Sequence, residues 1–198
     1  MSISTFSELQ TAIADWSHRA NLTSYLPDFV TMAENKIFSD LKVKEMEART
    51  TYTPTSRYLS TPTGMTGIRR LIALTTPPVE LFSTSPDGLH TVYDTASGTP
   101  SYYAVLGSEI EFNRIPNVDV ELLYYAAPTA LSASNATNAI LTAYPNIYLA
   151  ACMVECAMFI KDPSMLATWQ GKYADAVAAA NRKSSKFHTA GPMATVSA

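Results

Sequence analysis

The chain has only two cysteines, Cys152 and Cys156, which stand four residues apart and would share one side of a helix. A closed zinc site needs four ligands, and the three histidines, His18, His90 and His188, show no paired spacing. A disulfide within one helical turn is also geometrically poor, because the two Cβ vectors run alongside each other. We therefore expect no metal and no cofactor, and we interpret both thiols as buried core residues.

Charge is scarce as well. Charged residues make up 16% of the 198 residues, against about 25% in an average soluble domain. The net charge of −3 argues against broad binding to nucleic acid or to an anionic membrane, although a small basic patch stays open. The 11 tyrosines suit interfaces, since their rings have a polar tip. The composition therefore predicts a surface that a partner covers.

Long apolar runs and a signal sequence are absent too. The longest apolar-rich stretch, Ile147 to Ile160, is interrupted by Glu155 and is shorter than the roughly 20 residues that span a bilayer. The opening MSISTFSELQ lacks the basic and apolar regions of a signal peptide. We expect a soluble, non-secreted protein with no membrane partner.

Sequence motifs for catalysis are missing. There is no phosphate loop, no G-x-S-x-G elbow and no H-E-x-x-H. Glu109 with Glu111, and Asp119 with Glu121, are spaced to lie on one side of a strand, where paired carboxylates could do acid–base work. Alternation alone, however, places them on a polar sheet face. No catalytic constellation can therefore be named from the sequence.

Helical patterns occupy the first part of the chain. Thr5 to Glu8 has the spacing of a capping box, and apolar residues then recur on one face of a helix predicted over Phe6 to Arg19. Tyr25 to Asp28 opens a second helix, with Lys42 and Lys44 near its negative end. The short link between the two helices predicts an antiparallel hairpin.

Two further helices are predicted near the C-terminus. The apolar run from Ile147 to Ile160 fills nearly all of a helix surface, which predicts a buried helix. A polar connector, Thr129 to Ala139, precedes it. In the last helix Asp162 would be the N-cap and Pro163 the first residue.

Between the helical ends the pattern has a period of two residues. Gly107-Ser108 suits a two-residue turn, and we predict a three-stranded antiparallel meander from Ser101 to Ala127. Weaker strands are predicted at 50–53, 68–75 and 79–83, and an exposed excursion at 85–100.

The patterns together predict an α+β fold, with a helical bundle built from the N- and C-terminal helices and an inserted antiparallel β-sheet domain. The predicted parts are an N-terminal helical hairpin (1–45), the β-rich insertion (46–128), a C-terminal helical pair that completes the bundle (129–187) and an extended tail (188–198).

The candidate partner-binding residues lie at the C-terminus. A basic cluster at the end of the last helix would either complement the helix dipole or contact an acidic partner or nucleic acid. The tail that follows has no periodicity, and it could order against a partner by adding a strand or filling a groove. The candidates are Arg182, Lys183, Lys186, His188, Pro192, Met193 and Val196.

The order of several motifs resembles the tailed-bacteriophage head-to-tail adaptor family, also called connector or head-completion proteins. These motifs are Ala14-Asp15-Trp16 with Arg19, Ala33-Glu34-Asn-Lys-Ile37, Asp40-Leu41, Tyr124-Tyr125-Ala-Ala-Pro128, Leu131-Ser132, Tyr144-Pro145-Asn-Ile-Tyr148-Leu149, Glu155, Phe159-Ile-Lys-Asp162 and Trp169. Gly107 to Pro116 also fits the family, whereas 74–100 matches nothing in it.

The resemblance implies a virion structural protein that is assembled in the host cytoplasm and lies at the head–tail interface. Such a protein binds beneath the portal protein as a dodecameric ring, extends the channel for the viral DNA and forms a platform for nozzle or tail-tube proteins. We expect residues 188–198 to dock onto the portal. Two alternatives remain: another virion component, such as a minor head or tail-completion protein, and a small-molecule-binding module.

Overall fold

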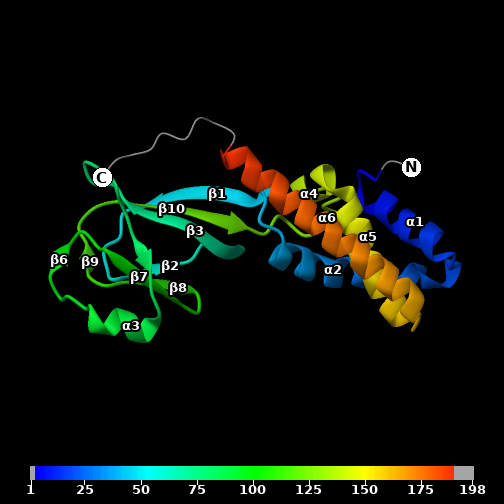
Figure 1. Cartoon of the computed structure of the whole chain (residues 1–198), viewed down its shortest axis with the longest axis horizontal. Coiled ribbons are helices and arrows are strands. Elements are labelled where there is room, and N and C mark those ends of the chain that lie inside the picture. The colour runs from blue at the N-terminus through cyan, green and yellow to red at the C-terminus, as the bar shows by residue number, and fades with distance from the viewer. Residues whose placement is uncertain (1–2, 190–198) are drawn as a thin grey trace. The chain divides into compact units, whose positions relative to one another are not determined.

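The computed structural model describes residues 3–189 and contains helices together with mainly antiparallel sheets (Figure 1). The chain forms two compact units, which we call the helical unit (1–46 and 128–198) and the sheet unit (47–127). The helical unit is therefore assembled from both ends of the chain, and the sheet unit is inserted between them. This arrangement confirms the predicted α+β fold.

The helical unit has five α-helices and two short 3₁₀ helices in the described residues. They are α1 (Phe6–Ser17), η1 (Ala20–Tyr25), α2 (Leu26–Asp40), η2 (Lys44–Met46), α4 (Ala139–Ala143), α5 (Pro145–Phe159) and α6 (Pro163–Thr189). The capping box at the start of α1 is confirmed, since the Thr5 hydroxyl accepts from the Glu8 amide at 3.3 Å. α1 ends at Ser17 instead of Arg19 because His18 takes a left-handed backbone conformation, with φ 51°. The sequence did not predict α4.

α5 is the centre of the helical unit. Nine of its 15 residues are buried, among them Tyr148, Cys152 and Cys156, which confirms the predicted buried helix. α6 lies alongside it in Figure 1, and α1 and α2 also pack against it. A helix that is apolar on every side must be enclosed by neighbours. The other helices of the unit supply that enclosure.

α6 follows the predicted capping. The Asp162 carboxylate accepts from the Met165 amide at 2.9 Å, and Pro163 is the first helical residue. The spacing of Leu166, Trp169, Tyr173, Val177 and Ala180 in the sequence predicts an apolar stripe on this helix, and Trp169, Tyr173 and Ala180 are buried. The helix continues through Thr189, so the backbone of His188 is helical. Pro192, Met193 and Val196 lie outside the described residues.

The sheet unit holds two four-stranded sheets and a two-stranded pair. The first sheet has the order β1 (Glu47–Tyr52), β10 (Val120–Ala126), β3 (Met65–Ala73) and β4 (Val79–Glu80), and the second has the order β2 (Tyr58–Ser60), β8 (Glu109–Phe112), β7 (Tyr102–Leu106) and β5 (Phe82–Ser83). The pair consists of β6 (Ser97–Gly98) and β9 (Ile115–Pro116). Buried residues from both four-stranded sheets form one core, including Leu71, Phe112 and Leu122.

The predicted meander is wrong in its last strand. β7 and β8 form the expected hairpin around Gly107, whose φ of +60° suits the turn. β10, however, pairs with β1 and β3 in the other sheet. Alternation identifies a strand and its buried face, but it does not identify the strand beside it.

The prediction of an exposed excursion at 85–100 is also wrong. Residues Pro86–Thr91 form the short helix α3, and Leu89 and Pro100 are buried. α3 packs against β7, and Tyr93 donates a hydrogen bond to Glu111, which is only 6% exposed. The alternation with Glu109 predicts that Glu111 lies on a free polar face. The structure shows instead that Glu111 is buried. The segment after α3 covers it.

A polar cluster holds this segment to the second sheet. The Arg57 guanidinium lies 3.7 Å from the centroid of the Tyr93 ring and donates to the carbonyls of Asp94 at 2.7 Å and Asn113 at 3.3 Å. Arg114 pairs with the Asp94 carboxylate at 2.6 Å. These contacts satisfy backbone groups that a loop would otherwise leave to water.

A second buried carboxylate, Glu34, links α2 to the connector before α4. It is 3% exposed and accepts hydrogen bonds from the Leu131 amide at 2.9 Å and the Tyr148 hydroxyl at 3.0 Å. Asn138, which caps α4, donates to the same hydroxyl at 2.8 Å. Burial raises the pKa of Glu34 above its usual value of 4.5, and the two hydrogen bonds oppose that rise.

We predict that Glu34→Gln reduces the pH dependence of helical-unit stability. Because the pKa of Glu34 is raised in the folded state, its contribution is fully present below pH 4.5 and declines as the pH rises through the folded-state pKa. The glutamine side chain of the variant cannot ionise, so the variant should gain stability relative to the native protein over this interval. Urea unfolding followed by tryptophan fluorescence measures this, since Trp16 and Trp169 both lie in the helical unit. Parallel pH profiles would contradict the prediction.

Candidate interaction surfaces

The structure places both cysteines in the interior of α5. Burial raises the pKa of both Cys152 and Cys156, so the thiols stay protonated and unreactive. No group of three or more His, Cys, Asp or Glu within that range could hold a metal ion. Glu109 and Glu111, the carboxylate pair considered from the sequence, differ in environment, since Glu109 is exposed and Glu111 is bonded to Tyr93. The surfaces of the protein are therefore the candidate sites.

Five exposed cations lie on the last turns of α6 and on the segment after α2, and we call them the basic surface. They are Lys42, Lys44, Arg182, Lys183 and Lys186. The sequence predicted a basic cluster from the three residues on α6. Lys42 and Lys44 come from the segment after α2, and the fold brings their backbone beside α6.

Three hydrogen bonds hold the two segments of the basic surface together. The Asn181 side chain accepts from the Lys42 amide at 2.8 Å and donates to the Asp40 carbonyl at 3.1 Å. The Ser184 hydroxyl, on a residue 3% exposed, accepts from the Lys44 amide at 3.0 Å. The backbone of the linker is thus fixed to α6, while the lysine side chains project to solvent.

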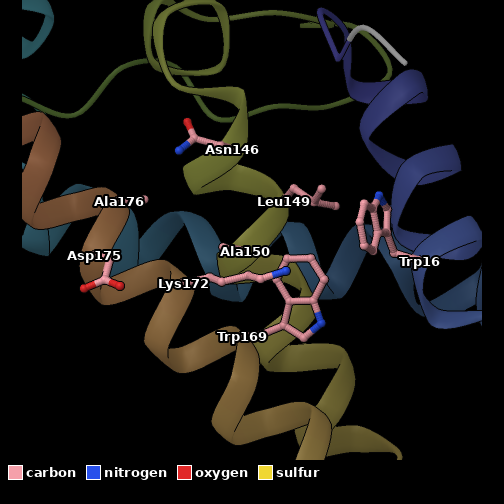
Figure 2. Close-up of a pocket in the computed structure, with 8 residues that line it drawn as sticks. All are labelled: Trp16, Asn146, Leu149, Ala150, Trp169, Lys172, Asp175 and Ala176. Atoms are coloured by element: carbon pink, nitrogen blue, oxygen red, sulfur yellow. The ribbon is translucent and has the colours of Figure 1, made fainter.

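A groove of about 510 Å³ lies between α1, α5 and α6. Figure 2 shows Trp169 and Lys172 of α6 reaching across α5 toward Trp16 of α1, and the other lining residues are Asn146, Leu149, Ala150, Asp175 and Ala176. The two tryptophan rings meet edge to face, with centroids 5.4 Å apart. We call this the tryptophan groove.

Lys172 lies over the tryptophan groove. Its ammonium group is 4.3 Å from the Trp169 ring centroid and 5.6 Å from that of Trp16. This cation–π contact already uses the ring faces that could attract a cationic ligand. The groove has no set of convergent buried polar groups, which a small-molecule site would need to orient its ligand. Its chemistry instead suits an apolar side chain of a partner.

The sequence did not predict the tryptophan groove. Both tryptophans belong to the apolar stripes of their helices, yet Trp16 is 53% exposed whereas Trp169 is 8% exposed. The two residues are far apart in the sequence, and no local spacing relates them. Only the packing of α1 and α6 on α5 brings them together.

We predict that the two tryptophans differ in their contribution to stability. Trp169→Ala should lower the free energy of unfolding by about 3–5 kcal/mol, because it empties a buried site. Trp16→Ala should lower it by about 1 kcal/mol, the value of an edge-to-face aromatic pair. Urea unfolding followed by circular dichroism at 222 nm gives both values. Phe187→Ala is the control, because this aromatic residue of α6 is 65% exposed. Equal losses in the free energy of unfolding for Trp16→Ala and Trp169→Ala would contradict the prediction.

No helix in the described part of the chain has the length and apolar character to cross a bilayer.

Comparison with known proteins identifies the family. No curated protein matches the chain. The family model described as SU10 adaptor protein matches residues 4–195, which is nearly the whole chain and includes both units. The chain therefore belongs to the SU10 adaptor protein family, a family of phage head-to-tail adaptors.

Proposed function

We propose that the protein forms a dodecameric ring beneath the portal, where it extends the channel for the viral DNA and provides the platform for the tail. The observation that carries this proposal is the family match over residues 4–195. Adaptors of this kind are virion components that interact with portal and tail proteins. The protein acts through binding surfaces and not through catalysis.

The exposed apolar side chains support an assembled role. Met158 and Phe159 of α5 are 56% and 49% exposed, and Phe82 and Leu106 of the sheet unit are 64% and 63% exposed. Exposed rings adjoin in each unit, Tyr25 beside Phe159 and Phe82 beside Tyr102, and adjoining exposed apolar groups are typical of binding surfaces. Both units therefore have surfaces suited to neighbouring subunits or partner proteins.

The C-terminal candidates are assigned to the portal. Arg182, Lys183 and Lys186 lie on the last turns of α6, and the residues from 190 onwards, including Pro192, Met193 and Val196, follow that end in the sequence. We propose that this uncharged segment docks onto the portal. His188 lies near the end of α6, and we propose that it contacts the portal beside this segment.

The experiment for the ring is a light-scattering mass after gel filtration, on the protein alone and mixed with the cognate portal. A chain that joins the portal in equal subunit number supports the adaptor role, because a ring beneath the portal must follow its symmetry. A chain that ignores the portal would favour a minor head or tail-completion protein instead.

Deletion of residues 190–198 tests the portal contact. We expect portal attachment to be lost while the unfolding midpoint of the chain is unchanged, because all described helices and strands end by Thr189. Co-sedimentation with the portal measures attachment, and circular dichroism measures folding. The proposal fails if the shortened chain attaches to the portal as well as the full chain does.

A further inference from the structure

We propose that a groove of the sheet unit binds an extended, uncharged segment of a tail protein, which joins the unit as an added strand. This inference rests on the proposed function, from which it takes that a tail protein docks onto the chain. The portal contact is assigned to the end of α6 in the helical unit, which leaves the sheet unit for a separate partner. The segment is defined by its chemistry, namely free backbone groups and side chains without charge.

The side of the sheet unit where β3 faces β7 is closed along only part of its length. The chain crosses from the first sheet to the second through residues 79–83, as β4 and then β5. β4 pairs with Ile72 and Ala73 of β3, and β5 pairs with Tyr102 and Tyr103 of β7. Beyond these pairs, no described strand lies between the two facing edges.

Two strand edges face the open part. In the portion of the chain that the structure describes, no strand pairs with the outer edge of β3 at 65–68 or of β7 at 104–106. An open edge presents backbone N–H and C=O groups that can pair with another chain. Neither segment contains the proline or the charged residues with which proteins protect such edges. Both edges are therefore suited to strand addition.

A groove of about 460 Å³ lies between these edges, and we call it the seam groove. β3 contributes Met65, Gly67 and Ile68 to its lining, and β7 contributes Tyr103 and Val105. Tyr103 belongs to the buried core of the sheet unit, and Met65 and Ile68 pack against that core. The groove therefore opens onto the core, so an apolar side chain that entered it would be withdrawn from water.

Gly67 provides space in the seam groove. A Cβ atom at this position would meet no other atom within 4 Å. Glycine inside a strand often marks a place where another backbone approaches closely. The pairing of β3 with β10 is also irregular here, with a register shift between Tyr125 and Ala126. A partner backbone can thus come close to β3 at Gly67.

The lining residues of the seam groove carry no charge. A charged side chain in the groove would lose hydration without gaining an ion partner. Elsewhere the first sheet does carry ion pairs, Arg49 with Glu121 and Arg69 with Glu47. The groove therefore favours an uncharged segment. Its apolar residues should stand at alternate positions, because successive side chains of a strand point to opposite faces.

Amide hydrogen exchange followed by mass spectrometry tests the added strand. The full chain is measured alone, with the cognate portal and with each cognate tail protein. When the tail protein is bound, amides within 65–68 and 104–106 should exchange about tenfold more slowly, because an added strand gives the open N–H groups hydrogen-bond acceptors. The portal alone should leave exchange at both edges unchanged.

Two variants block the seam groove. Gly67→Phe adds a ring where a Cβ meets no atom, at a glycine without a positive φ, and Val105→Lys adds a charge at a residue 41% exposed. Each should lower the affinity for the tail protein by about 30-fold or more, the loss typical of an interface hot spot. Each should still join the portal as the native chain does.

Matched controls carry the same new side chains outside the groove. Gly171→Phe changes another glycine whose Cβ would meet no atom within 4 Å, and Val79→Lys changes a residue of the same unit that is 42% exposed. Both controls should bind the tail protein with native affinity. Circular dichroism should show a folded chain for all four variants.

Several results would overturn the inference. Native affinity in both blocking variants, an equal loss in the controls, or a chain that joins the portal but binds no tail protein refutes it and leaves the proposed ring intact. Slow exchange in the free chain that deletion of residues 190–198 abolishes would assign the groove to the chain's own end. Slow exchange that appears on self-association would assign it to a second copy. A chain that ignores the portal refutes the proposed function, whether or not its groove binds the tail protein.

Discussion

The burial of most of α5 is the constraint on which the helical unit depends. Nine of its 15 residues are withdrawn from water, and its apolar residues do not form a single stripe that one neighbour could cover. It therefore needs several neighbours, and the chain takes them from both of its ends. The N-terminal helices and α6 must meet around α5, so the sheet unit is necessarily an insertion between them.

Polar groups inside both units tie irregular segments to the regular elements. Glu34 fixes the connector before α4 to α2, and Glu111 with Arg57 fixes the segment after α3 to the second sheet. A buried carboxylate is tolerated only when hydrogen bonds replace its lost hydration. These contacts hold irregular stretches of the described chain against helices and strands. The side chains that stay exposed form the tryptophan groove and the basic surface.

Those surfaces differ in chemistry, as expected of a protein that joins several partners. The tryptophan groove is apolar with one cation over its rings, while the basic surface concentrates charge in a chain that otherwise has little. Neither resembles a catalytic site, and membership of a phage adaptor family agrees with a role through binding. An adaptor needs separate faces for the portal and for the tail, and one chain must supply both.

Local patterns in the sequence determined the four long helices, the caps of α1 and α6 and most of the strands, because the capping box at Thr5, the N-cap at Asp162 and the turn at Gly107 act within a few residues. They also determined that the cysteines are core residues. Tertiary structure alone decided that β10 joins β1 and β3, that Glu111 is buried, and that Lys42 and Lys44 lie beside α6. Each of these depends on contacts between residues distant in sequence. Periodicity shows which face of an element is apolar but not which element covers it.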